Sequence, residues 1–136
     1  MRSPLLLDTG GWLKALAGDR PWADAVEEAG ELIVPGLVLA EVDYHLRHQR
    51  RAMHRLLQDL ESGAYRYEPP TASDLARARE LDARFKKLDL GLVDASVAAL
   101  AERLGVFRVL TTDSDFVALR VGPGYRLAFE LACPLA

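Results

Sequence analysis

The chain has 136 residues, of which 50% are apolar and 27% charged, and its formal net charge is −3 at pH 7. These values predict one domain, spanning residues 1–136, around a single core, and they exclude a disordered chain. No apolar stretch is long enough for a membrane span, and the apolar segment before Asp8 is too short for a signal peptide, so we expect a cytoplasmic protein. The single cysteine, Cys133, excludes an internal disulfide and a zinc site built from thiolates.

Short apolar runs alternate with helical patterns along the whole chain. In chain order we expect a strand at 4–7, helices at 12–17 and 21–29, a strand at 32–34, a long helical stretch from 39 to 60, a short edge strand at 65–67, helices beginning at 71 and 91, a strand at 107–110, a helical turn at 113–116 and a last strand at 127–129. Strands separated by helices require crossover connections. The fold class predicted is therefore α/β, with a mostly parallel sheet of about five strands covered on both faces.

Several residues mark the ends of these elements. Asp19 is placed to cap the second helix, and Thr71 with Asp74 makes a capping box for the helix that follows. Gly105 is typical of the residue just after a helix. In the 39–60 stretch, apolar residues recur at three-, four- and seven-residue steps, which predicts one continuous buried stripe.

Four carboxylates stand where the surrounding sequence is apolar. Asp8 follows three leucines directly, Asp113 follows an apolar strand and two threonines, and Glu41 and Asp94 are isolated charges near the starts of the two most apolar helices. A charge on an apolar face is costly unless it is paired or bound to a cation. Any one of these acids alone would be interpreted as a helix cap or a turn residue.

The four acids together favour a metal site. Residues that follow parallel strands gather at one edge of the sheet, which is the usual ligand crevice of such folds. Carboxylates that converge in a dry cleft repel one another, so either their pKa values rise or hard cations neutralise them. Oxygen ligands without cysteine suit Mg²⁺ or Mn²⁺, and such a site activates water for attack on a phosphate ester.

Basic charge is concentrated in one segment. Between Arg47 and Arg55 the chain carries four arginines and two histidines with no acid, and it holds fourteen arginines against three lysines. Because guanidinium groups pair with phosphate oxygens, Arg47, Arg50, Arg51 and Arg55 are candidates for contacting an RNA backbone. A solvated helix face and a general bias toward arginine explain the same pattern.

The motifs that carry the four acids resemble those of the PIN-domain ribonucleases, and most closely the VapC toxins of type II toxin–antitoxin systems. They occur in the same order and cover essentially the whole chain, as Leu6-Leu7-Asp8-Thr9, Leu39-Ala40-Glu41-Val42, Leu90-Gly91-Leu92-Val93-Asp94-Ala95-Ser96 and Leu110-Thr111-Thr112-Asp113-Ser114-Asp115-Phe116.

This resemblance implies a PIN-like three-layer α/β/α sandwich and a Mg²⁺-dependent endoribonuclease, in which Mn²⁺ also serves. It implies that Asp8, Glu41, Asp94 and Asp113 are the catalytic, metal-binding acids, with RNA as substrate, a cognate antitoxin as inhibitor and a homodimeric assembly. Asp115 is a fifth acid within reach of that site and is equally suited to capping the next turn. Asp89, five residues before Asp94, is a weaker candidate.

The resemblance has one departure. The first motif of the family commonly continues with serine, whereas this chain has Gly10, so a supporting hydroxyl is missing. Thr9, Ser96 and Thr112 are the candidates to supply hydroxyls instead, because residues that orient metal ligands matter almost as much as the ligands.

Four other interpretations remain at this stage. Asp8-Thr9-Gly10 spells the catalytic triplet of aspartic proteases, although their fold is all-β. A phosphoacceptor receiver domain also places acids at strand ends, but it needs a lysine near its C-terminal edge and none follows Lys87. Glu41, His45 and His48 share a helix face that suits a transition metal. The non-enzyme alternative is a PIN-like module that binds proteins and has little catalytic activity.

Overall fold

The computed structural model describes residues 3–135 and confirms the α/β class. Its main sheet has five strands in the order β3-β2-β1-β4-β7, and every neighbouring pair is parallel. The strands of this sheet are β1 (Pro4–Leu7), β2 (Glu31–Pro35), β3 (Arg66–Glu68), β4 (Arg108–Leu110) and β7 (Glu130–Leu131). A separate antiparallel pair consists of β5 (Arg120–Val121) and β6 (Leu127–Ala128).

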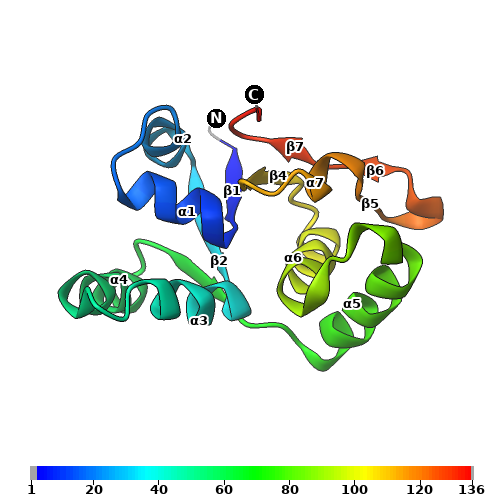
Figure 1. Cartoon of the computed structure of the whole chain (residues 1–136), viewed down its shortest axis with the longest axis horizontal. Helices are drawn as coiled ribbons and strands as arrows, with labels where there is room; N and C mark the ends of the chain where they lie inside the picture. Colours follow the sequence, from blue (N-terminus) through cyan, green and yellow to red (C-terminus); the bar gives the residue numbers. More distant parts are fainter. Residues whose placement is uncertain (1–2, 136) are drawn as a thin grey trace.

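Helices cover the main sheet on both sides, as Figure 1 shows: α1, α2 and α4 lie on one side, and α5 and α6 on the other. The α-helices are α1 (Thr9–Leu16), α2 (Trp22–Glu28), α3 (Gly36–His45), α4 (Arg50–Ser62), α5 (Ala72–Arg84), α6 (Gly91–Leu104) and α7 (Asp115–Ala118). Short 3₁₀ turns lie at Lys86–Leu88 and Pro123–Tyr125. Over residues 3–135, none of these helices is long and apolar enough to cross a membrane.

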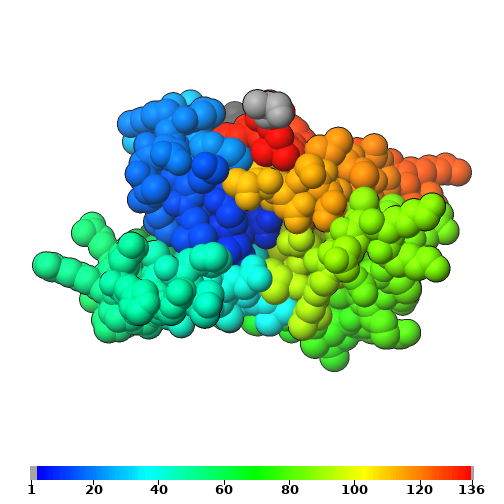
Figure 2. Space-filling model, viewed as in Figure 1, coloured from blue at the N-terminus to red at the C-terminus, as the bar shows by residue number. Residues whose placement is uncertain are grey.

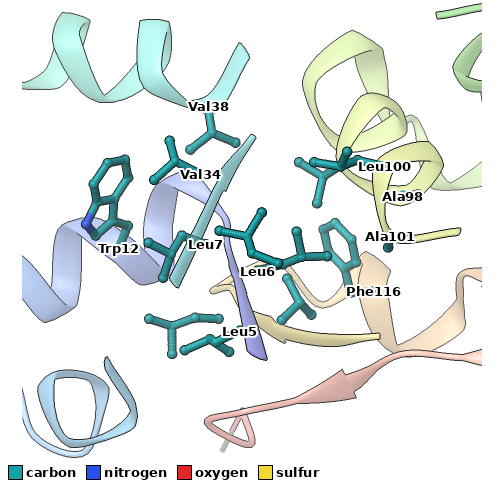
Figure 3. Packing of buried hydrophobic residues seen from close by; sticks show 14 of the residues in the cluster. Leu5, Leu6, Leu7, Trp12, Val34, Val38, Ala98, Leu100, Ala101 and Phe116 are labelled. Atoms are coloured by element: carbon teal, nitrogen blue, oxygen red, sulfur yellow. The ribbon is translucent and has the colours of Figure 1, made fainter. Parts of the chain in front are cut away.

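The central strand β1 supplies both halves of the core. Leu5, Leu6 and Leu7 are fully buried, and because successive side chains of a strand point to opposite faces, they pack in two directions. Figure 3 shows Leu7 directed toward Trp12 of α1 and Leu6 directed toward Phe116 and α6. A strand that is buried on both faces has an uninterrupted apolar sequence, as this segment does.

The register of β1 sets the edge on which the site is built. Leu7 of β1 is paired with Leu110 of β4, and the backbone N–H of Asp8 donates to the carbonyl of Leu110 at 3.0 Å. Asp8 and Thr111 therefore leave the sheet at the same level, at the carboxyl ends of two adjacent parallel strands.

The predicted helix ends are confirmed at two places. Thr71 and Asp74 form both hydrogen bonds of a capping box, at 3.0 and 2.9 Å, at the start of α5. Gly105 ends α6 with a φ of 68°, a left-handed conformation that favours glycine. The cap predicted for the second helix is wrong: Pro21 occupies that position, and Asp19 instead accepts a hydrogen bond from the backbone of Ala23 through its carbonyl.

The predicted long helix over 39–60 is also wrong, because the structure divides it into α3 and α4. The buried stripe has no member between Leu46 and Met53, so nothing in that interval holds a continuous helix against the core. Arg47 closes the end of α3, since both its backbone N–H and its Nη1 donate to the carbonyl of Tyr44, at 3.2 and 2.9 Å. An ion pair of 2.8 Å between Asp43 and Arg50 joins the two helices across the break.

The C-terminal region differs from the sequence prediction in one further respect. The segment predicted as a last strand, 127–129, pairs with β5 in the small antiparallel sheet, and the fifth strand of the main sheet is β7. Phe129 lies between the two short strands and is buried against Phe116 and Phe107. A three-residue apolar run does not reveal which neighbour it pairs with.

Candidate metal centre

The acids singled out in the sequence meet at the carboxyl edge of the sheet. Asp8 follows β1, Asp113 lies on the loop after β4, Glu41 lies on α3 and Asp94 lies in the first turns of α6. Figure 2 shows the segments that carry them, coloured blue, cyan, yellow-green and orange, converging near the middle of one face. The charges of Asp8, Glu41 and Asp113 all act on Asp94, so the four groups form one electrostatic cluster.

Asp8 and Asp113 are held together by a threonine that the sequence analysis did not select. The hydroxyl of Thr111, which is completely buried, donates to Asp8 Oδ2 at 2.6 Å and accepts from the backbone N–H of Asp113 at 3.0 Å. Asp8 is only 4% exposed, and burial raises its pKa. Hydrogen bonds from Thr111 and from the Thr9 backbone partly offset that rise, whereas the charges of Asp113 and Glu41 add to it.

Glu41 is oriented by Thr9, the residue that follows Asp8. The Thr9 hydroxyl donates to Glu41 Oε1 at 2.6 Å, linking the start of α1 to α3. Thr9 thus performs the supporting role predicted for it. Together, the hydroxyls of Thr9 and Thr111 fix one oxygen of Glu41 and one of Asp8.

Asp94, Asp113 and Asp115 form the tightest part of the cluster. Each offers a carboxylate oxygen, and the three oxygens lie within 4.8 Å of one another. The N–H of Asp115 donates to Asp113 Oδ1 at 2.9 Å, so the loop after β4 folds both acids toward α6. Asp115 therefore joins the predicted quartet as a fifth acid, and its pKa is raised by burial and by the charge of Asp113.

Burial raises the pKa of Asp94 to about 9, and a hydrogen bond with Asp113 and the charges of Asp8, Asp113 and Glu41 contribute to the same rise. Throughout residues 3–135, no lysine, arginine or histidine forms an ion pair with any of the five acids. Burial and the neighbouring acids therefore favour the protonated form of Asp94 when no cation is bound. Because its donors are all carboxylate oxygens, the cluster fits a hard divalent cation such as Mg²⁺ or Mn²⁺.

The close approach of α1 to the end of β4 requires the two glycines after Thr9. A Cβ on Gly11 would lie 2.7 Å from the backbone nitrogen of Thr111 and closer still to the Leu110 carbonyl. A Cβ on Gly10 would overlap the hydroxyl of Thr112 and lie 3.2 Å from its Cβ. Thr112 therefore fills the space that a serine side chain at position 10 would need. This accounts for glycine at a position where the family commonly has serine.

The other predicted residues have different positions. Ser96 does not support the acids, because its hydroxyl donates to the carbonyl of Val93 in its own helix at 2.7 Å. Asp89 is exposed and acts on the cluster only through its charge on Asp115. The four arginines, Arg47, Arg50, Arg51 and Arg55, are all exposed on the α3–α4 connection and α4, outside the acid cluster.

The structure excludes two of the alternative interpretations. A parallel α/β sheet is incompatible with the all-β fold of aspartic proteases, so Asp8-Thr9-Gly10 is not their catalytic triplet. Glu41, His45 and His48 do not assemble as a metal site; in the described part of the chain, only Asp94, Asp113 and Asp115 meet that geometry.

Comparison with known proteins agrees with this geometry. The PIN domain family matches residues 5–121. Ribonuclease VapC26 of Mycobacterium tuberculosis (strain ATCC 25618 / H37Rv) is 30% identical over 129 residues, which cover 88% of this chain and 96% of the relative.

Two solved structures share the fold. VapC20 of Mycobacterium tuberculosis, a toxin that cleaves the sarcin–ricin loop, gives a TM-score of 0.73 at 24% identity, over 84% of this chain and 93% of that one. VapBC2 from Rickettsia felis, bound to a DNA fragment from its promoter, gives a TM-score of 0.68 at 16% identity, over 94% and 98% of the two chains. From the family match and the identity to VapC26, we conclude that the chain belongs to the PIN domain family, among its VapC ribonuclease toxins.

Proposed function

We propose that this protein is a Mg²⁺-dependent endoribonuclease, the toxin of a toxin–antitoxin pair, which hydrolyses phosphodiester bonds in RNA. The observation that carries the proposal is a cluster of five acids, with no basic side chain of residues 3–135 paired to them, at the carboxyl edge of a PIN-domain sheet. A structural role does not account for it, because mutually repelling carboxylates destabilise the fold that holds them.

Asp8, Glu41, Asp94 and Asp113 are the proposed metal ligands and catalytic acids, and Asp115 is placed to add a further oxygen. Mg²⁺ held there would polarise the scissile phosphate and lower the pKa of the attacking water. Thr111 and Thr9 orient the carboxylates of Asp8 and Glu41 through their 2.6 Å hydrogen bonds. The attack would leave a 5′-phosphate and a 3′-hydroxyl, as the family resemblance implies.

The proposal includes an RNA substrate, a cognate antitoxin and a second copy of the chain. Exposed arginines 47, 50, 51 and 55 provide positive charge for the RNA backbone, although Arg50 is engaged with Asp43 and Arg47 with Tyr44. A cognate antitoxin is proposed from the similarity to VapBC2, and a homodimer from the family resemblance.

The experiment is a cleavage assay with end-labelled RNAs in Mg²⁺, Mn²⁺ or EDTA. The panel includes total ribosomal RNA, transfer RNA and a synthetic hairpin with the sarcin–ricin loop sequence, since VapC20 cleaves that loop. We expect cuts at discrete sites that need the metal and disappear in Asp94→Asn. The matched control is Asp19→Asn, which changes an exposed aspartate that pairs with Lys14 and should cleave as the wild type does.

Two outcomes would contradict the proposal. Equal cleavage by the wild type and Asp94→Asn would mean that the acid cluster does not carry the activity. Failure to cut any RNA of the panel in either metal would favour a PIN-like module that binds proteins instead.

A further inference from the structure

A hollow of about 510 Å³ opens beside the acid cluster, between α3 and α6. Its walls include Leu37 and Tyr44 of α3, Leu92 and Val93 of α6, and Glu41, one of the proposed metal ligands. We call it the Tyr44 hollow. Because Glu41 belongs both to this hollow and to the acid cluster, whatever occupies the hollow lies next to the acid cluster.

The hollow has an unusually exposed lining. Tyr44 is 61% exposed and Leu92 is 60% exposed, so two large apolar side chains face solvent within one site. The guanidinium carbon of Arg47 lies 4.2 Å from the centre of the Tyr44 ring, and Arg47 is fixed there by its hydrogen bond to the Tyr44 carbonyl. His45 meets the ring edge-on, with the ring centres 5.8 Å apart. The ring is therefore oriented in advance while most of its surface remains accessible.

We propose that Tyr44 stacks on an unpaired base of the RNA substrate, next to the phosphate that is cleaved. This inference rests on the proposed function. A nucleotide next to a phosphate held at the acid cluster is within reach of the wall that contains Glu41, and Tyr44 lies about one helical turn further along α3. Aromatic rings in nucleic-acid sites recognise splayed bases in this way, with arginine beside them to neutralise the backbone.

The chemistry of the hollow favours a nucleotide over an apolar protein segment. A stacked base presents one flat face and leaves its edges in water, which suits a ring with a cation on one side and a carboxylate nearby. A protein surface that filled the hollow would cover Glu41, and this charge would lose its contact with solvent. The faces of a base inside a duplex are covered by its neighbours, so stacking on Tyr44 requires an unpaired nucleotide.

The test measures stacking separately from cleavage. The probe is a single-stranded heptauridylate with one central 2-aminopurine, whose fluorescence falls when the base stacks. It is titrated into protein carrying Asp94→Asn, so that binding is followed without hydrolysis. In that background, Tyr44→Phe keeps the ring, Tyr44→Leu keeps an apolar side chain, and Tyr44→Ala keeps neither. Tyr67→Ala removes another exposed tyrosine, on β3 and outside the hollow, as the matched control.

We expect the parent protein, Tyr44→Phe and Tyr67→Ala to quench the probe and bind it with similar affinity. Tyr44→Leu and Tyr44→Ala should lose the quench and bind about 10- to 100-fold more weakly. A duplex in which 2-aminopurine is paired should not be quenched by any of them. The inference is overturned if Tyr44→Leu binds and quenches as Tyr44 does, or if the parent protein does not quench the probe.

Sedimentation of the same variants tests the other occupant, a second copy of the chain. If Tyr44→Ala converts a dimer to a monomer and leaves RNA binding unchanged, the hollow is an interface between copies and the inference is wrong. A cleavage assay of Tyr44→Ala in Mg²⁺, with Asp94 intact, distinguishes failure of the stacking inference from failure of the proposed nuclease activity. Unchanged kcat/KM on a cleaved RNA would refute the stacking role alone, whereas a wild type that cuts no RNA refutes the nuclease whatever the probe shows.

Discussion

Two aspartates, each near the start of a helix, have neighbours of opposite charge. Asp74, at the start of α5, is 3% exposed and accepts hydrogen bonds from Arg103 Nε at 2.9 and 3.1 Å and from the Thr71 backbone at 2.9 Å. Burial raises its pKa, but these bonds more than reverse the effect, so the pKa lies below the ordinary value. Asp94, at the start of α6, has acids for neighbours and a pKa of about 9.

The contrast separates a structural carboxylate from a functional one. Around Asp74, the fold supplies every partner that the charge needs, including the Arg103 guanidinium. Around Asp94 the fold supplies only more negative charge, so the missing partner must come from solution. Burial alone therefore does not distinguish a structural acid from a functional one. The charge of the groups around the carboxylate does.

Among the ion-pair substitutions, the largest loss of stability is expected from Arg103→Ala. This change leaves the buried carboxylate of Asp74 with the Thr71 hydrogen bonds alone, and should lower the free energy of unfolding by about 3 kcal/mol, the low end for breaking a buried pair because water already reaches Arg103. Urea unfolding measures the loss. Arg79→Ala, an exposed arginine on α5 with no ion pair in the described residues, is the control and should change stability by less than about 0.5 kcal/mol. A similar small effect for Arg103→Ala would contradict the structural role of the pair.

A smaller effect, on function, is expected from Thr111→Val. Valine keeps the shape of threonine but leaves Asp8 Oδ2 and the Asp113 N–H without their shared partner. Loss of such an orienting group commonly reduces metal affinity or activity by about 10- to 100-fold. The measurement is the cleavage rate as a function of Mg²⁺ concentration, with Thr112→Val, the exposed neighbour, as the control. Equal curves for the two variants would show that Thr111 does not position the site.

The two aspartates should also act in opposite directions on the pH dependence of stability, measured in EDTA. Asp94 has an ordinary value of 3.8 when unfolded, so between about pH 4 and pH 9 the folded protein holds a proton that the unfolded chain has lost. The free energy of unfolding should therefore fall as pH rises through this range. The lowered pKa of Asp74 stabilises the fold above about pH 4, and that contribution is lost as pH falls through its folded-state pKa.

Urea unfolding at a series of pH values measures both slopes. Asp94→Asn should flatten the decline toward alkaline pH and leave the acid side unchanged, whereas Asp74→Asn should do the reverse. An alkaline decline that is as steep in Asp94→Asn as in the wild type would place the raised pKa on another group.

Local sequence patterns correctly predicted several elements of the fold. The apolar run of β1, the capping box at Thr71 and the glycine after α6 depend on neighbours a few residues away, and all three are present in the structure. The division between α3 and α4 depends on whether residues between Leu46 and Met53 find a surface to pack on, which is a tertiary property. The pairing of β6 with β5 was missed for the same reason.

The positions of the acids were predictable because each stands alone in an apolar segment or directly after a strand. The residue that joins Asp8 to Asp113 was not, because Thr111 and Thr112 are chemically identical neighbours. A signal was present: Thr111 directly follows β4 and lies two residues before Asp113, a spacing at which a threonine hydroxyl can bond to a backbone N–H. The Thr112 side chain instead occupies the space beside Gly10.

If the five-acid cluster is a cation site, metal-free protein should bind Mn²⁺ there. The most direct test is to titrate metal-free protein with Mn²⁺ and to measure the heat of binding by calorimetry. The account predicts saturable binding by the wild type and by Asp19→Asn, and binding more than about tenfold weaker in Asp94→Asn. It also predicts that Mn²⁺ raises the Tm of the first two proteins more than that of Asp94→Asn. Equal affinity for Mn²⁺ in all three proteins, or no binding by the wild type, would contradict the claim.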